Sequence, residues 1–202
     1  MVTDQSRRRS ARLTGPRALR AYAHPTRLRL MALLRQSGPQ TATQAAMATG
    51  ESVASCSFHF RQMAKYGLVE QAGGGRGREK PWRATAMVTE WDPVSPHDPV
   101  TAEAAQALQL ALAEQYFELT ARWLRTQPGE AGEWREAAQF GDYLLFLTAA
   151  ELNGLGRKIQ NLLRAYGGRL EDPAGRPPGS RPVIVLQLAF PALLTGDGSA
   201  AD

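Results

Sequence analysis

The chain between Ser52 and Lys65 carries polar side chains at the spacing of one helix face. At about 100° per residue, a helix groups four apolar side chains on one side, which are Val53, Cys56, Phe60 and Met63. The opposite side mixes hydroxyl, aromatic, cationic and amide groups, which are Ser55, Phe58, Arg61, Gln62 and Lys65. Such groups can contact base edges in the DNA major groove, whose width admits a helix. A solvated polar face is the ordinary alternative, because most surface helices have one.

A basic, glycine-rich hairpin is predicted directly after this helix. Residues 68–70 and 81–83 read as two short strands, and Gly67 suits the left-handed position just past the helix end. The turn between the strands holds three cations, Arg76, Arg78 and Lys80. A cationic hairpin tip can contact phosphates or the minor groove, so we expect these cations, together with Ser52 and Lys65, to hold phosphates. A nucleotide-binding loop is not expected, because the P-loop pattern is absent and no helix opens after the glycines.

Two shorter helices are predicted ahead of these elements. Pro25 fits the first turn of a helix that ends at Ser-Gly-Pro, residues 37–39. A second helix begins after Thr41 or Thr43 and runs through Ala48. Three short helices followed by a hairpin therefore make up a unit that spans residues 16–85.

Three segments of this unit resemble ArsR-type winged helix–turn–helix regulators. Residues 21–31, AYAHPTRLRLM, resemble the opening helix of those proteins. Residues 52–63 and 66–70 resemble their recognition helix and first wing strand, and residues 75–83 look like the wing of a subset. The resemblance covers roughly residues 16–85 and implies a dimeric transcription regulator that binds operator DNA, usually as a repressor.

The resemblance does not imply a metal site. Metal-sensing members carry paired cysteines on the helix before the recognition helix, where this chain has Ala45, Ala46 and Met47, or histidines and acids on a terminal helix. Cys56 falls on the apolar face, so we interpret it as a small core residue. His59 is interpreted as a packing or backbone-supporting residue, with phosphate contact as the alternative. We expect no metal and no cofactor.

Charge divides the chain into two halves. Residues 1–85 hold 15 basic and four acidic side chains, a net of +11, whereas residues 86–202 hold nine and 15, a net of −6. The basic half is suited to an anionic partner. Residues 1–15 read as a disordered basic arm in which four arginines offer a mobile contact to phosphate or the minor groove: Arg7, Arg8, Arg9 and Arg12.

Composition excludes several classes of protein. With 43% hydrophobic residues the chain is not disordered as a whole, and no apolar run approaches the ~20 residues of a membrane helix. The N-terminal arginines precede no apolar stretch, so a secretory signal is not expected. Cys56 is the single cysteine, which excludes an internal disulfide. We expect a reduced, cytoplasmic protein.

The second half is predicted to open with a linker over residues 86–100, which holds three prolines, and a long helix over 101–126 capped by Thr101. One apolar row of this helix has steps of three and four: Ala105, Leu108, Leu112, Tyr116, Leu119 and Trp123. A second row has steps of seven: Leu110, Phe117 and Leu124. We favour one row packing within the subunit and the other against a second subunit, over complete burial in one domain.

The remaining residues predict a strand, a helix and a strand. Tyr143–Leu147 and Val183–Phe190 are compact apolar runs, and Thr148 with Glu151 makes a capping box for the helix between them. Whether the strands pair parallel, antiparallel or across a dimer stays open. Aromatic side chains in this half are candidates for an effector pocket, although ordinary core is the simpler reading. No catalytic set of residues is visible, so an enzyme is not expected.

These observations predict a mainly α protein with small β elements. The winged helix–turn–helix (16–85) is followed by the linker (86–100), a dimerisation and regulatory domain (101–194) and a polar tail (195–202). The predicted function is a sequence-specific, double-stranded-DNA-binding transcription regulator, a repressor that binds a near-palindromic operator as a homodimer. The alternatives are a winged-helix protein-interaction module, or a sensor whose C-terminal half binds a metal or an unknown small-molecule effector.

Overall fold

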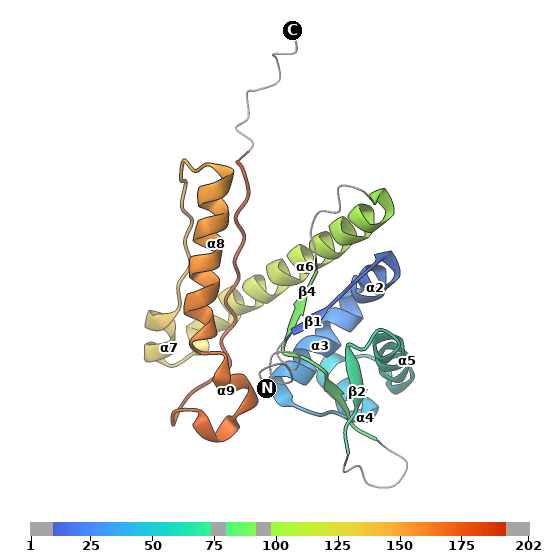
Figure 1. Cartoon of the computed structure of the whole chain (residues 1–202). Coiled ribbons are helices and arrows are strands. Elements are labelled where there is room, and N and C mark those ends of the chain that lie inside the picture. The colour runs from blue at the N-terminus through green and yellow to red at the C-terminus, as the bar shows by residue number, and fades with distance from the viewer. Residues whose placement is uncertain (1–9, 74–79, 92–97, 193–202) are drawn as a thin grey trace, which may run out of the picture. The chain divides into compact units, whose positions relative to one another are not determined.

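The computed structural model of the chain describes residues 10–73, 80–91 and 98–192. The fold is mainly helical with two small sheets, as predicted (Figure 1). Two compact units divide after Glu136. The first unit contains β1 (Ser10–Arg12), α2 (Pro16–Tyr22), α3 (Pro25–Ser37), α4 (Ala42–Thr49), α5 (Val53–Ala64), β2 (Val69–Gln71), β3 (Trp82–Ala84), β4 (Val88–Glu90), α6 (Pro99–Thr126) and η1 (Gln127–Gly129). At the division lies α7 (Gly132–Ala137), and the second unit contains α8 (Ala149–Arg164), α9 (Gly168–Glu171) and η2 (Pro173–Gly175).

The three short helices predicted for the first unit are confirmed. Thr41 caps α4 through a capping box with Gln44, which settles the choice between the two candidate threonines. Gly50 ends α4 at φ 74°, and its N–H donates to the Ala46 carbonyl at 2.9 Å. A side chain at this left-handed position would be strained, so Gly50 permits the sharp turn from α4 into α5.

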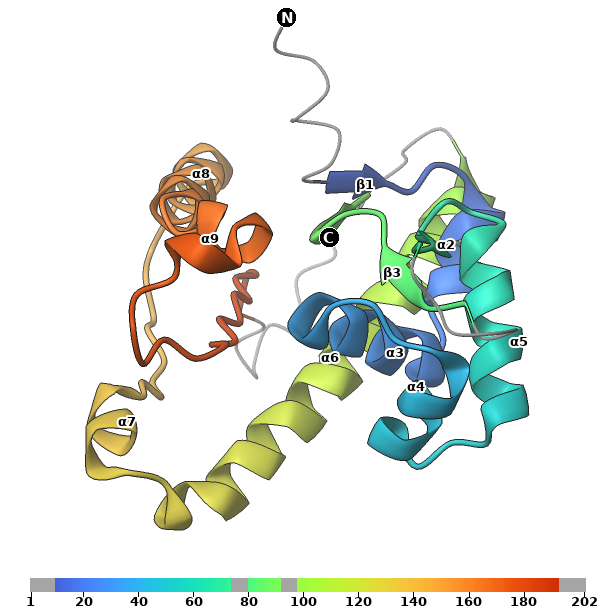
Figure 2. The same cartoon turned by 90° about the horizontal axis from the view of Figure 1, so that it is seen from below.

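A single hydrophobic core joins these helices to the start of α6. Leu19 and Tyr22 of α2 are buried, as are Ala104, Ala105 and Leu108 of α6, and α2 packs along α6. Figure 2 shows α3, α4 and α5 gathered on one side of α6. Each of the helices α2 to α6 contributes buried side chains to this core. Its fully buried large side chains are Phe60, Leu19, Leu28, Leu30, Met31, Met63, Leu68 and Leu108.

The prediction of a disordered arm over residues 1–15 is wrong for its last part. Ser10–Arg12 form β1, which pairs in parallel with Val88–Glu90 of β4. The Leu13 N–H then donates to the Glu90 carbonyl at 2.8 Å, and the Leu13 side chain is buried. The sequence pattern missed this pairing because β4 lies some 75 residues further on, within the segment predicted to be a linker. Arg7, Arg8 and Arg9 lie outside the described residues.

The long helix begins earlier than predicted. Asp98, and not Thr101, is the N-cap of α6, because its carboxylate accepts from the N–H groups of Val100 and Thr101 at 3.1 and 3.2 Å. Pro99 then occupies the first turn, where a missing N–H has no cost.

The two apolar rows of α6 differ in burial. Leu108 of the first row is buried, whereas Leu110 and Phe117 of the second row are 60% and 75% exposed. Within the described ranges, neither α6 nor another helix is long and apolar enough to span a membrane.

In the second unit the capping box is confirmed, but the two predicted strands are wrong. Thr148 and Glu151 cap α8 reciprocally. Tyr143–Leu147 and Val183–Phe190 run along either side of α8 as extended chain, and neither has a strand partner among the described residues (Figure 1). Their apolar composition gives them strand character, yet a strand requires a hydrogen-bonded neighbour, and α8 separates the two segments.

Candidate nucleic-acid interface

The helix α5 has the N-cap and most of the buried face that its sequence predicts, but Val53 is exposed and His59 is buried. Ser52 caps it by accepting from the Ser55 N–H at 3.1 Å. Cys56, Phe60 and Met63 are fully buried, but Val53 is 47% exposed, so the prediction of Val53 as a core residue is wrong. His59, only 8% exposed, borders the buried face on the side opposite Val53, so the outward face is turned toward Arg61.

The outward face of α5 is apolar and cationic together. Phe58 is 49% exposed, and Arg61 and Lys65 are exposed beside it. The Arg61 guanidinium donates to the Ser57 hydroxyl at 2.7 Å, one helical turn earlier, which orients the cation along the helix. Gln62 is half-buried at the edge of this face. The α5 segment contains no acidic residue, so this surface presents only neutral and positive groups.

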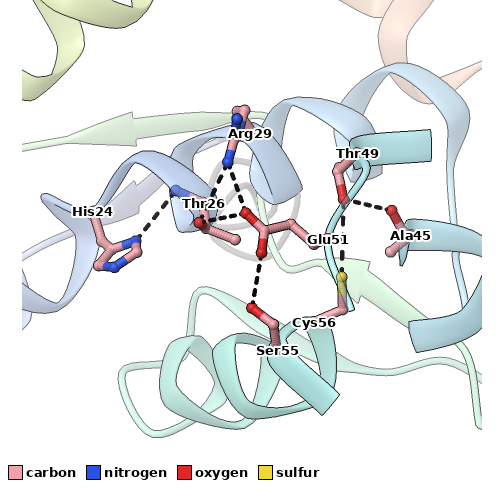
Figure 3. A network of polar contacts seen from close by, with 8 residues as sticks. All are labelled: His24, Thr26, Arg29, Ala45, Thr49, Glu51, Ser55 and Cys56. Carbon is pink, nitrogen blue, oxygen red and sulfur yellow. Dashed lines mark hydrogen bonds and ion pairs between the residues drawn. The ribbon is translucent and has the colours of Figure 1, made fainter. Parts of the chain in front are cut away.

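A polar network joins the start of α5 to the start of α3 (Figure 3). The Glu51 carboxylate accepts from the Thr26 hydroxyl at 3.0 Å, the Arg29 guanidinium at 2.8 Å and the Ser55 hydroxyl at 3.1 Å. The hydrogen bonds from Thr26 and Ser55 are the main cause of a lowered pKa of Glu51, and the Arg29 charge adds to the effect. Thus one ionised carboxylate fixes the N-terminus of α5 against α3.

This network changes the interpretation of Ser55. The structure places Ser55 on the side of α5 that faces α3, half-buried, with its hydroxyl hydrogen directed at Glu51. A hydroxyl in this arrangement supports the position of the helix. Its predicted contact with a base has no support in this geometry, in contrast to Phe58 and Arg61, which face outward.

Two histidine rings pack against each other at a tilt of 43° behind the outward face. The rings of His24 and His59 lie 4.6 Å apart, and His24 Nδ1 accepts from the Thr26 N–H at 3.2 Å as the N-cap of α3. Burial lowers the pKa of both rings, and the nearby Arg27 charge lowers both further, against an opposing effect of Glu51. The burial of His59 and its contact with His24 support the packing role predicted for it, and the lowered pKa values favour the neutral form of both rings.

The wing hairpin is anchored to α5 by stacked aromatic rings. Phe60 and Trp82 lie 5.7 Å apart at 21°, which joins the buried face of α5 to β3. The strands β2 and β3 pair antiparallel, and Arg83 forms an ion pair of 2.6 Å with Glu70 across them. Lys80 is exposed at the start of the returning strand, whereas Arg76 and Arg78 lie outside the described residues.

Cys56 has the environment of a core residue. It is fully buried, and its sulfur lies 3.9 Å from the Thr49 hydroxyl, which itself donates to the Ala45 carbonyl (Figure 3). Burial raises the pKa of the thiol. Among the described residues no group of three or more histidine, cysteine, aspartate or glutamate side chains is placed to hold a metal ion.

Sequence reasoning missed two groups that shape this surface. Glu51 was not singled out, although an acid directly before the helix cap is unusual in a half with only four acidic residues. Ser57 was also missed, although its spacing of four residues from Arg61 is the spacing of side-chain pairs on a helix. The spacing identifies the partner of Ser57 on the same helix, whereas nothing in the sequence around Glu51 identifies its partners on α3.

The comparisons with known proteins agree with this geometry. A family described as a helix-turn-helix domain matches residues 22–72, which contain α3, α4, α5 and β2. A search of curated proteins found no match. The matched segment holds both the turn at Gly50 and the outward face of α5. Residues 22–72 of this chain are therefore a helix–turn–helix domain, and this match supports a role in DNA binding.

Proposed function

We propose that this chain is a sequence-specific transcription regulator of ArsR-like, winged type, which represses by binding a near-palindromic operator as a homodimer. The observation that carries the proposal is the outward face of α5, where Phe58 and Arg61 project from a helix that Glu51 fixes at its N-terminus. A fixed helix with neutral and cationic side chains suits the major groove. The role is one of binding in the cytoplasm without catalysis.

The contacts divide by chemistry. Phe58, Arg61 and Gln62 are proposed to meet base edges or the groove wall, since they lie on or beside the outward face. Lys65 at the helix end and the wing cations are proposed to meet phosphates, which set affinity and register without reading sequence. Ser52 keeps a hydroxyl at the exposed N-terminus of α5, where the helix dipole favours a phosphate.

The homodimer is supported by the second apolar row of α6. Leu110, Phe117 and Leu124 are 60%, 75% and 41% exposed, although they recur at steps of seven. Such a row suits packing against a second helix. A two-fold dimer would set two α5 helices in successive major grooves, about 34 Å apart.

Selection of bound sites from a random duplex pool, with the purified full chain, tests the function. A recovered motif with two inverted half-sites about one helical turn apart is the expected result. A Gln62→Ala variant should then relax discrimination at one base position in each half-site. Salt-insensitive or undetectable DNA binding would contradict the proposal and favour a protein-interaction module.

A further inference from the structure

The second unit leaves two uncharged, extended segments exposed to solvent. Tyr143, Phe146 and Phe190 are 91%, 93% and 75% exposed. Every leucine, isoleucine and valine of Tyr143–Leu147 and Val183–Phe190 is at least 38% exposed. Exposed apolar side chains that follow one another along an extended segment mark an interaction surface, because soluble monomers rarely expose large apolar patches.

The main chain of both segments also lacks partners. Within the described residues, no backbone N–H or carbonyl of Tyr143–Leu147 or Val183–Phe190 forms a backbone hydrogen bond. Neither segment contains a charged residue or a proline, the features that protect the edge strands of monomeric proteins. A second strand would pair with this main chain, and an apolar partner would cover the exposed side chains.

We propose that a second copy of this chain supplies that strand: Val183–Phe190 pairs antiparallel with the same segment of its partner about a two-fold axis. Two identical segments related by such an axis are self-complementary, so no second surface is required. The inference deepens the homodimer of the proposed function and rests on it for the two-fold symmetry. It adds an interface outside the DNA-binding domain.

The Val183–Phe190 segment offers its own apolar surface to such a partner. At roughly 200 Å² for a whole aromatic side chain, Phe190 alone exposes about 150 Å². Five aliphatic side chains of the same segment are 38–68% exposed and count toward the roughly 800 Å² that each partner contributes to a stable interface: Val183, Ile184, Val185, Leu186 and Leu188. The absence of charge in both segments disfavours DNA or an acidic protein as the occupant.

Single cysteines along the strand test the pairing in the full chain. In an antiparallel pair, the separation between a residue and its own copy grows by about 7 Å per residue from the axis, and a disulfide requires Cα atoms within about 7 Å. Among Val183→Cys, Ile184→Cys, Val185→Cys, Leu186→Cys and Gln187→Cys, disulfide-linked dimers should concentrate at one or two adjacent positions. Buried Cys56 supplies no competing thiol. No disulfide-linked dimer, or an even yield at all positions, would overturn the proposal.

Two proline variants test the backbone directly. Val185→Pro and Leu186→Pro each remove one N–H that has no backbone partner among the described residues. Because alternate N–H groups of a strand point to the same neighbour, one of the two variants should keep the native helix content but weaken dimerisation at least tenfold. Gln139→Pro, in the extended chain before the first segment, is the matched control and should dimerise as the native protein does. Unchanged dimerisation constants for both Val185→Pro and Leu186→Pro would overturn the interface.

The molar mass measured by light scattering distinguishes failure of the homodimer from failure of the Val183–Phe190 interface. A native mass of twice 22.0 kDa supports the homodimer, and the cysteine and proline results then decide the interface. A native mass of 22.0 kDa at micromolar concentration would remove the homodimer of the proposed function together with this interface. A native dimer with scattered or absent cross-links removes the interface alone.

Discussion

The Arg29 guanidinium lies 2.8 Å from the Glu51 carboxylate, and this ion pair joins α3 to the residue before the cap of α5. Because the Glu51 side chain is only 24% exposed and accepts three hydrogen bonds, its loss leaves two hydroxyls and a guanidinium without their acceptor. We expect Glu51→Ala to lower the free energy of unfolding by about 2 kcal/mol, measured by urea denaturation.

Glu70→Ala is the matched control for this prediction. Glu70 also pairs with an arginine, Arg83, but both side chains are at least half exposed, so its loss should cost less than about 0.5 kcal/mol. Glu51→Ala should in addition weaken binding to the selected operator more than binding to random duplexes. Equal effects of the two variants on stability would show that the Glu51 network does not fix α5.

Substitutions of Phe58 and Phe60 should distinguish an effect on DNA binding from an effect on folding stability. Phe60 is fully buried, so Phe60→Ala should lower the free energy of unfolding by about 3–5 kcal/mol. Phe58 is 49% exposed on the outward face, so Phe58→Ala should cost under about 1 kcal/mol yet weaken operator binding at least tenfold. Fluorescence anisotropy with labelled duplex gives the affinity. Full affinity in Phe58→Ala would remove this side chain from the interface.

The neutral histidine pair predicts a loss of stability in acid. Both His24 and His59 have pKa values lowered by burial, so the unfolded chain, with histidine pKa values near ~6.5, binds more protons. The contribution of the two histidines to the free energy of unfolding is complete above pH ~6.5 and is lost as the pH falls through their pKa values in the folded protein. Within that window the slope approaches about 1.4 kcal/mol per pH unit for each histidine.

His24→Asn tests the same window, because asparagine keeps an acceptor for the N-terminus of α3 but cannot be protonated. Urea denaturation between pH 5 and 7.5 should show a pH dependence smaller by about one proton in the variant. A slope identical to that of the native protein would exclude His24 as the responsible group.

The wing cations are expected to act on DNA phosphates. Arg76→Ala with Arg78→Ala should weaken binding to all duplexes alike and reduce the slope of log affinity against log salt by about 1.8. Arg83→Ala is the comparison, because the Arg83 guanidinium is already paired with Glu70 and should change the slope much less. A salt slope that survives the double substitution would place the wing outside the interface.

Local patterns predicted most of the DNA-binding domain. Caps at Ser52 and Thr41, the glycine at the turn and the apolar spacing in α5 are all short-range signals, and the structure confirms them except for the burial of Val53. The burial of His59 in place of Val53 was not predictable, because helical spacing alone does not reveal that His24 packs on His59 from a different helix. The Glu51 network was missed for the same reason, since its partners Thr26 and Arg29 are more than 20 residues away.

Pairing between distant segments was the least predictable feature. The β1 strand is three residues long and pairs with β4 far along the chain, so the sequence of neither strand indicates its partner. The two apolar runs of the second unit have the composition of strands, but composition does not supply a hydrogen-bonded neighbour. Sequence alone therefore identifies strand character without deciding whether the same chain satisfies it.

The parallel pairing of β1 with β4 brings residue 12 beside residue 90. Everything between them, including α3, α4, α5 and the hairpin, is a loop of chain that leaves and returns at the same place. Adjacent ends of this kind are what make a segment tolerate insertion into another scaffold. The chain between residues 12 and 90 can therefore be exchanged as one piece while α6 is kept, provided that the replacement carries side chains that pack against Ala104, Ala105 and Leu108 in the shared core.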